Sequence, residues 1–377
     1  MTVLIVGAGF AGATIGRVLA EAGIRSVIIE KRSHIGGNAF DELNEQNERV
    51  HRYGPHLLHG NINSEAVNFL SRFCSWVPYE HRVRALLQGG ETTPLPINRT
   101  TLEDIFNLEL SNNDETQKFL DSLRAHGITP TNSDQLFQAN VGDQLADLFF
   151  RPYTKKMWGV DAKELAVSVG ARLPVRTNRD DRYFTDTFQA LPSNGYTSLF
   201  EHLLDHPLIE VHLNRTFSKD MESGYDHCFL AVPIDQYFDY CYGHLPYRSI
   251  LFHQTTSNSK QSATQVNFTD SGPYTRMTQW CLLPNSPGKG PGPYQITLEE
   301  PCSMKNNPGE YYYPVKTKAS EELFKRYEKI AKSKPHITFC GRTGLFRYID
   351  MIPAVSMHLS IARNYLSKLN EQTAYAI

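Results

Sequence analysis

The chain has 377 residues, and its 38 Lys and Arg nearly balance 40 Asp and Glu, so the formal net charge at pH 7 is −2. Such a balance produces no field of one sign and argues against nucleic acid or an anionic membrane as the partner. The length is enough for a large core and predicts two or three structural units.

Cysteine usage and hydropathy indicate the compartment. The six cysteines are scattered without a CxxC pair and follow no secretory leader, which predicts reduced thiols in a cytoplasmic protein. No apolar run approaches the roughly 20 residues that a spanning helix needs. We therefore expect no integral membrane contact.

The N-terminal stretch predicts a βαβ unit. A β-branched strand, residues 2–6, runs into "GAGFAG" and a helical period, and a second strand ends at Glu30. Gly7 permits the tight turn, Gly9 lets a pyrophosphate approach, and Gly12 allows close helix packing. Because Glu30 falls where a carboxylate binds the adenosine ribose, the pattern predicts dinucleotide binding.

A second glycine turn, Gly36-Gly37, follows directly after this unit and favours a flavin dinucleotide over a nicotinamide one. Near the C-terminus the pattern recurs, because a strand at 336–340 ends in Gly341-Arg342 before a last helix. Arg342 and Asp350 suit a phosphate and the ribityl hydroxyls. The alternative for these two residues is a surface ion pair that closes the helix.

The middle of the chain divides into a helical stretch, residues 100–159, and several β-rich runs, among them "TRMTQWCLL", residues 275–283. Residues 81–97 read as a hairpin that turns at Gly89-Gly90. The predicted fold class is α/β: a Rossmann-type FAD-binding domain with a helical insert and an antiparallel β-sheet domain. The expected ranges are 1–75, 190–245 and 335–377 for the FAD-binding domain, 100–170 for the insert, and 76–99, 171–189 and 246–334 for the sheet domain.

Three histidines gather in "HRYGPHLLHG", residues 51–60. Metal binding would need them on one side with a carboxylate or thiol, but the Gly-Pro pair between them breaks regular spacing. We therefore predict no metal site. The remaining interpretations are contact with a flat group and hydrogen bonding within the core.

Motifs along nearly the whole chain resemble bacterial UDP-galactopyranose mutases. They are "GAGFAG", "EKRSHIGGNA", "HRYGPHLLH", "RPYTKKMWG", "RLPVR", "RYF", "PIDQYFDY", "NFTD", "PYTR", "YYYPV" and "GR" followed by "YIDM". The resemblance implies an isomerase that uses FAD in its reduced form, with NAD(P)H as candidate reductant. It would convert UDP-galactopyranose to UDP-galactofuranose, or a related nucleotide sugar, for cell surface polysaccharide biosynthesis. It also implies a homodimer and a covalent bond between flavin N5 and sugar C1.

The resemblance assigns site residues by position. Arg172 and Arg276 would clamp the diphosphate, with Arg172 on a mobile segment, and His56 and His59 would face the isoalloxazine. The substrate would meet Asn98, Asn267, Tyr153, Trp158, Tyr183, Tyr313 and Tyr348. The cofactor would meet Gly7, Gly9, Phe10, Ala11, Gly12, Glu30, Lys31, Gly37, Asn38, His56, Arg342, Asp350 and Met351.

Five positions depart from the pattern of the galactose enzymes: Leu58, Gly60, Pro152, Gln279 and Cys340. Those enzymes usually have threonine where Gly60 stands. A packing difference accounts for Cys340, whereas the other four are expected to lie close to the flavin, the sugar or the nucleotide. These departures are compatible with a different substrate, such as an N-acetylated, deoxy or higher-carbon sugar on UDP, dTDP or GDP. Two other classes of function compete with the mutase. One is an amine-oxidase-like FAD oxidoreductase, and the other is a scaffold that binds nucleotide without chemistry.

Overall fold

A computed structural model describes residues 1–87, 89–171, 174–288 and 290–374. Its first sheet has five parallel strands in the order β10-β2-β1-β11-β17. They are β1 (Thr2–Val6), β2 (Arg25–Ile29), β10 (Ile209–His212), β11 (His227–Leu230) and β17 (Ile337–Phe339). The central strands are apolar and buried, as parallel strands covered on both faces require.

Residues of four helices form the main core together with one face of this sheet. The helices are α1 (Phe10–Glu21), α2 (Glu65–Leu70), α8 (Gly195–Leu204) and α12 (Met351–Ala374). The other face of the sheet packs against α9 (Ile234–Tyr237) and neighbouring loops. Two further helices, α10 (Lys318–Ala331) and α11 (Gly341–Gly344), precede α12 in the sequence. The predicted βαβ opening is confirmed, with the helix beginning at Phe10.

A seven-stranded sheet stands beside the first, in the order β16-β12-β15-β14-β13-β7-β8. Its strands are β7 (Val83–Leu86), β8 (Thr92–Leu95), β12 (Tyr247–Ser257), β13 (Gln265–Phe268), β14 (Arg276–Gln279), β15 (Tyr294–Ser303) and β16 (Tyr313–Pro314). The β7–β8 hairpin is confirmed. The sheet is not wholly antiparallel, however: β7 and β13 run parallel, because the helical stretch separates them in sequence.

Smaller elements link the two sheets. β3 (Asp41–Leu43) pairs with β4 (Arg49–His51), while β9 (Phe188–Pro192) lies between β5 (Leu58–Gly60) and β6 (Trp76–Pro78). The prediction that the β-strand continues past Gln279 is wrong, since the chain turns there into a short 3-10 helix, Trp280–Leu282. The reason is Trp280, which is fully buried and donates its indole N–H to Thr297 Oγ1 at 2.8 Å.

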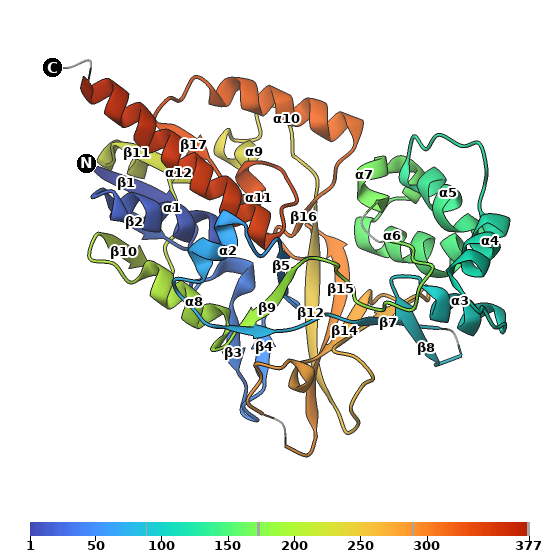
Figure 1. Cartoon of the computed structure of the whole chain (residues 1–377). Helices are drawn as coiled ribbons and strands as arrows, with labels where there is room; N and C mark the ends of the chain where they lie inside the picture. The colour runs from blue at the N-terminus through green and yellow to red at the C-terminus, as the bar shows by residue number, and fades with distance from the viewer. Residues whose placement is uncertain (88, 172–173, 289, 375–377) are drawn as a thin grey trace.

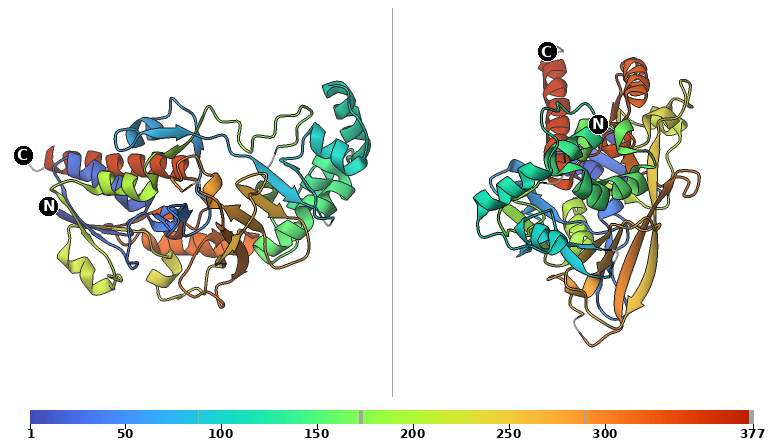
Figure 2. Two further views of the ribbon diagram at one scale, coloured as in Figure 1. Left: turned by 90° about the horizontal axis from the view of Figure 1, so that it is seen from below. Right: turned by 90° about the vertical axis from the view of Figure 1, so that its right-hand side faces the viewer.

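The helical insert consists of α3 (Arg99–Phe106), α4 (Asn113–Leu123), α5 (Ser133–Leu145), α6 (Arg151–Trp158) and α7 (Val167–Gly170). Figure 1 shows it at the opposite end of the molecule from the five-stranded sheet, and the left view of Figure 2 shows the seven-stranded sheet between them. The α/β class with a Rossmann-type part, a helical insert and a second sheet is thus confirmed. The exact domain boundaries stay a prediction. Among the described residues, no helix is both long and apolar enough to cross a membrane.

Candidate active site

A cavity of about 560 Å³ lies where the carboxyl ends of β1, β2, β11 and β17 meet. The glycines of the first turn shape it. Gly7 adopts a φ of +101°, and a Cβ on Gly12 would lie 1.9 Å from the Gly7 carbonyl oxygen, so neither position accepts a side chain without distortion. α1 begins here without a side-chain cap, which leaves its first backbone N–H groups available to an anion.

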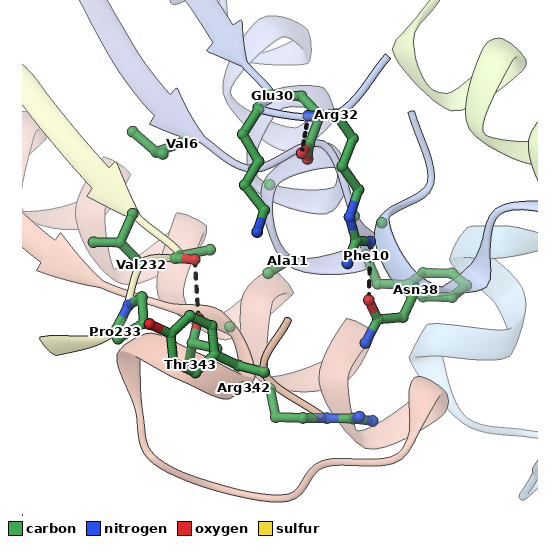
Figure 3. A pocket seen from close by; sticks show the side chains of 18 of the residues that line it. Val6, Phe10, Ala11, Glu30, Arg32, Asn38, Val232, Pro233, Arg342 and Thr343 are labelled. Atoms are coloured by element: carbon green, nitrogen blue, oxygen red, sulfur yellow. Dashed lines mark hydrogen bonds between the residues drawn. The ribbon is translucent and has the colours of Figure 1, made fainter. Parts of the chain in front are cut away.

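The second glycine turn meets the first. A Cβ on Gly37 would lie 3.1 Å from the Cα of Gly9, so two bare backbone segments face each other at the cavity. Glu30 lies beside them, buried, and its carboxylate accepts from the N–H of Ala8 at 2.9 Å and of Arg32 at 3.0 Å. These bonds hold the carboxylate at the end of β2 (Figure 3).

The C-terminal segment supplies the other side of the cavity. Arg342 lies across from Glu30 (Figure 3) and donates to the carbonyl oxygens of Tyr312 at 3.2 Å and Ile349 at 3.0 Å. The N–H of Gly341 donates to His358 Nε2 at 2.9 Å, inside the core. His358, which no sequence motif marked, therefore fixes the turn that carries Arg342.

All predicted cofactor residues but Asp350 line this cavity: Gly7, Gly9, Phe10, Ala11, Gly12, Glu30, Lys31, Gly37, Asn38, His56, Arg342 and Met351. Asp350 lines the neighbouring cavity instead. The donor set fits FAD, because bare backbone and a helix N-terminus suit a pyrophosphate and a fixed carboxylate suits a ribose. Asn38, whose side-chain oxygen accepts from Arg32 at 3.0 Å, stands at the junction of the two cavities.

The second cavity, of about 580 Å³, continues from the first toward the helical insert. Asn38, His56, Arg342 and Met351 line both cavities. The predicted site residues that it gathers are His56, His59, Tyr153, Trp158, Tyr183, Arg276, Tyr313, Tyr348, Asp350 and Met351. Residues far apart in sequence therefore meet in one place.

His56 is held by its own turn. Its Nδ1 donates to the Gly54 carbonyl oxygen at 2.8 Å, and its backbone N–H donates to His51 Nδ1 at 3.0 Å. Burial, aided by His51, lowers the pKa of His56 to about 3, so the ring is neutral at pH 7. No group of three or more potential metal-binding side chains occurs in the described part of the chain.

His59 lies further along the second cavity. Its ring stacks on Phe184, with centroids 3.6 Å apart and planes at 10°, and its Nδ1 lies 2.9 Å from Asp186 Oδ2. These contacts join β5 to the segment that precedes β9. His59 lines only the second cavity, whereas His56 lines both.

Arg276 is the cation of the second cavity that is tied to a buried carboxylate. It lies directly opposite Glu299 in the β14–β15 pair, and its Nε is 3.1 Å from Glu299 Oε2. Burial opposes the charge of Arg276, but Glu299 and nearby tyrosines raise its pKa well above the usual range. The guanidinium therefore stays charged.

An aromatic group stands near Arg276. Tyr313 stacks on Tyr348, with centroids 5.6 Å apart, and Trp158 meets Tyr313 edge-on at 5.9 Å. Arg342 places its guanidinium carbon 4.7 Å from the centre of the Tyr348 ring. Burial raises the pKa of Tyr313 to about 12, so its hydroxyl keeps the proton that it can donate.

The family model for UDP-galactopyranose mutase matches residues 148–348, and a model for NAD(P)-binding Rossmann-like domains matches residues 5–73. The chain is 37% identical to dTDP-fucopyranose mutase of Escherichia coli, over 98% of this chain and 99% of that protein. The chain belongs to the UDP-galactopyranose mutase family. A probable UDP-galactopyranose mutase of Klebsiella pneumoniae is 34% identical, over 98% of this chain and 96% of that one.

A crystal structure of reduced UDP-galactopyranose mutase superposes with a TM-score of 0.74 at 18% identity, covering 97% of this chain and 95% of that one, which supports the fold. Family membership makes the chain an enzyme of the isomerase class, because its relatives are named mutases. The resemblance stated from the motifs is therefore confirmed.

Two predicted site residues are not brought into the cavity by the structure. Asn98 is fully buried and caps α3, where its side-chain oxygen accepts from the Thr101 N–H at 3.1 Å. Asn267 accepts at 2.8 Å from Gln265, and it is Gln265 that lines the cavity. Arg172 lies outside the described residues.

The departures from the galactose pattern occupy different surroundings. Leu58 is 1% exposed and packs in the main core, while Gln279 bonds to the backbone of Gln261 at 2.8 Å and Ser259 at 2.9 Å. Neither residue lines either of the two cavities, and their expected closeness to the ligands stays a prediction. Gly60 faces Ile352, and Pro152 occupies the first turn of α6, where proline is tolerated.

Sequence reasoning missed several residues that line the second cavity: His81, Arg176, Gln265 and Glu299. Burial lowers the pKa of His81 to about 3, which keeps its ring neutral. Arg176 was present in the quoted "RLPVR" motif but was not singled out. Glu299 lies in a β-rich run without a motif, and only its register opposite Arg276 marks it.

Proposed function

We propose that this protein is a flavin-dependent nucleotide-sugar mutase that interconverts the pyranose and furanose forms of its substrate. One observation carries the proposal: the cavity suited to FAD opens into a second one that holds Arg276 and the stacked tyrosines. A nucleotide sugar in the second cavity would meet the flavin end of the cofactor at the residues shared by both, among them His56 and Arg342.

Reduced FAD, when bound, supplies a nucleophilic N5 for the anomeric carbon as the nucleoside diphosphate leaves. The chain must then hold the diphosphate close until it returns. Arg276, charged and buried, attracts it, and the hydroxyls of Tyr313 and Tyr348 are candidate donors to its oxygens. Neutral His56 places a polar group beside the flavin without adding a charge.

The nucleotide would reach toward the helical insert. Tyr153 and Trp158 of α6 line that part of the cavity and offer aromatic faces to a base and its ribose. We take UDP-galactopyranose and dTDP-fucopyranose as the two leading substrates, because the full-length relatives are named for these sugars. The homodimer, NAD(P)H as reductant and a role in surface polysaccharide synthesis belong to the same proposal and rest on the family resemblance. The cytoplasmic location belongs to it too and rests on the cysteine pattern.

The test uses purified protein with its flavin, reduced with dithionite and offered a panel of UDP- and dTDP-sugars without oxygen. We expect a furanose product by chromatography with the reduced enzyme and none with the oxidised enzyme. Arg276→Ala should keep flavin and lose turnover. In a parallel assay in air, consumption of oxygen in step with substrate would instead indicate the oxidoreductase, and binding without conversion in either assay would indicate the scaffold.

A further inference from the structure

Glu299 is the buried acid of the second cavity, and its two oxygens have different surroundings. Oε2 forms an ion pair with Arg276, 3.1 Å from Nε, although Nε has no hydrogen-bond partner in the described part of the chain. Oε1 has neither an ion-pair nor a hydrogen-bond partner among the described residues. The side chain is 2% exposed. A buried carboxylate with one unpaired oxygen is costly, so its presence calls for a role other than stability.

The unpaired oxygen is close to the turn that precedes His56. A Cβ placed on Gly54 would lie 2.9 Å from Glu299 Oε1. Because glycine has no Cβ, the carboxylate can approach the backbone of the turn closely. Gly54 also has a φ of +82°, which glycine tolerates best. Glu299 therefore stands between the arginine on one side and the Gly54-Pro55 turn on the other.

These two neighbours belong to different parts of the proposed reaction. Arg276 would hold the leaving diphosphate, while the turn carries His56 to the wall shared by the two cavities. The strand pairing makes the link rigid, since Arg276 and Glu299 are direct partners on β14 and β15. The Thr275 N–H also donates to the Glu299 carbonyl oxygen at 2.9 Å.

We propose, on the basis of the proposed function, that Glu299 is a positioning residue that fixes the Arg276 guanidinium relative to the Gly54-Pro55 turn. Transfer requires the diphosphate and the flavin to stay on opposite sides of one carbon atom. A carboxylate clamped between the two supports keeps this spacing during the reaction. Glu299 lines the second cavity but is not proposed to touch the sugar, because Oε2 lies beside Arg276 and Oε1 beside the Gly54 backbone.

The charge of Glu299 gives the proposal a distinctive test. Glu299→Gln removes a negative charge near the diphosphate while leaving Arg276 charged, so electrostatic attraction for the diphosphate is kept or strengthened. The orientation of the arginine is lost, and a displacement of about 1 Å can cost a factor of about 100 in rate. A merely structural role would weaken binding and turnover together.

The experiment compares Glu299→Gln with Glu300→Gln in the flavin-loaded enzyme. Glu300 is the next residue of β15, partly exposed, and pairs with His253 at 2.8 Å away from both cavities. Calorimetric titration with UDP and dTDP gives affinity, and the mutase assay gives kcat. We expect Glu299→Gln to lower kcat about 100-fold with unchanged or tighter diphosphate binding, and Glu300→Gln to behave as wild type.

A second variant covers the case in which Glu299→Gln folds poorly. Glu299→Asp keeps the charge but withdraws the carboxylate by one methylene group, and it should give the same split between kcat and diphosphate affinity. A kcat within about twofold of wild type in Glu299→Gln, or parallel loss of affinity and rate in both variants, overturns the inference. Absence of turnover in the wild-type enzyme on every sugar refutes the proposed function, and the inference falls with it.

Discussion

Tyr313 and Tyr348 lie nearly parallel, with planes at 13° and centroids 5.6 Å apart, although one belongs to β16 and the other to the loop before α12. The stack places two phenols beside the second cavity.

Tyr348→Phe keeps the stack and removes one hydroxyl. We expect kcat/KM to fall about 10-fold, the worth of one hydrogen bond to a charged group, while Tyr294→Phe, outside both cavities, has no effect. Unchanged steady-state kinetics for Tyr348→Phe would remove this tyrosine from the diphosphate site.

The glycine turn predicts a separation of folding from cofactor binding. A Cβ on Gly9 meets nothing closer than 3.6 Å, so Gly9→Ala fits the protein itself, but the methyl group enters the space proposed for the pyrophosphate. We expect a normally folded protein with little bound flavin, measured by absorbance and thermal melting of the apoprotein. Gly224→Ala, in open surroundings, is the control. Full flavin content in Gly9→Ala would place the pyrophosphate elsewhere.

Buried neutral histidines predict a loss of stability in weak acid. Burial lowers the pKa of His51, His56 and His81 to about 3, from 6.5 in a free side chain. As pH falls below 6.5 the unfolded chain takes up protons that the folded chain refuses, so stability falls until the folded pKa is reached. Between about pH 7.5 and about pH 5 each histidine should cost about 2 kcal/mol.

Urea unfolding at these two pH values measures the effect. His51→Gln should reduce the difference in unfolding free energy between them by about one histidine's share, about 2 kcal/mol, whatever it does to stability at the higher pH. An equally steep dependence in that variant would show that His51 is already charged in the folded protein.

The closeness of Gly60 to Ile352 predicts that substitutions at these two positions have coupled effects on stability. A Cβ on Gly60 would lie 3.1 Å from Ile352 Cγ2, a contact that requires the isoleucine to shift. Gly60→Thr, which restores the residue typical of the galactose enzymes, should cost about 1–3 kcal/mol through overpacking. Gly60→Thr combined with Ile352→Val should recover part of that loss. Thermal unfolding of the four proteins in this cycle gives the coupling energy, and additive effects would show that the two residues do not interact.

The N-terminal cofactor cavity was predictable because its signal is local. The glycines at 7, 9 and 12 and the acid at Glu30 act within one βαβ unit, where spacing in sequence determines spacing in space. The C-terminal return to the same cavity was predictable for a similar reason, since Gly341 and Arg342 directly follow a strand of the same sheet.

The second cavity was harder to predict because long-range strand register builds it. Nothing near Glu299 in sequence shows that it will face Arg276, 23 positions earlier; the β14–β15 pairing decides this. For Asn98 the local sequence was informative and the family pattern was not. The pattern placed Asn98 at the substrate, whereas its local sequence favours a helix cap, and the side chain caps α3.

The two ends of the described chain lie together beside the five-stranded sheet, where the Tyr365 hydroxyl approaches Met1 Sδ at 3.6 Å (Figure 1). The second cavity is instead lined by residues of the helical insert, among them Tyr153 and Trp158. An affinity tag or a surface anchor fused near either end would therefore leave substrate entry clear, which makes immobilised protein a practical form for electrochemical control of its redox state.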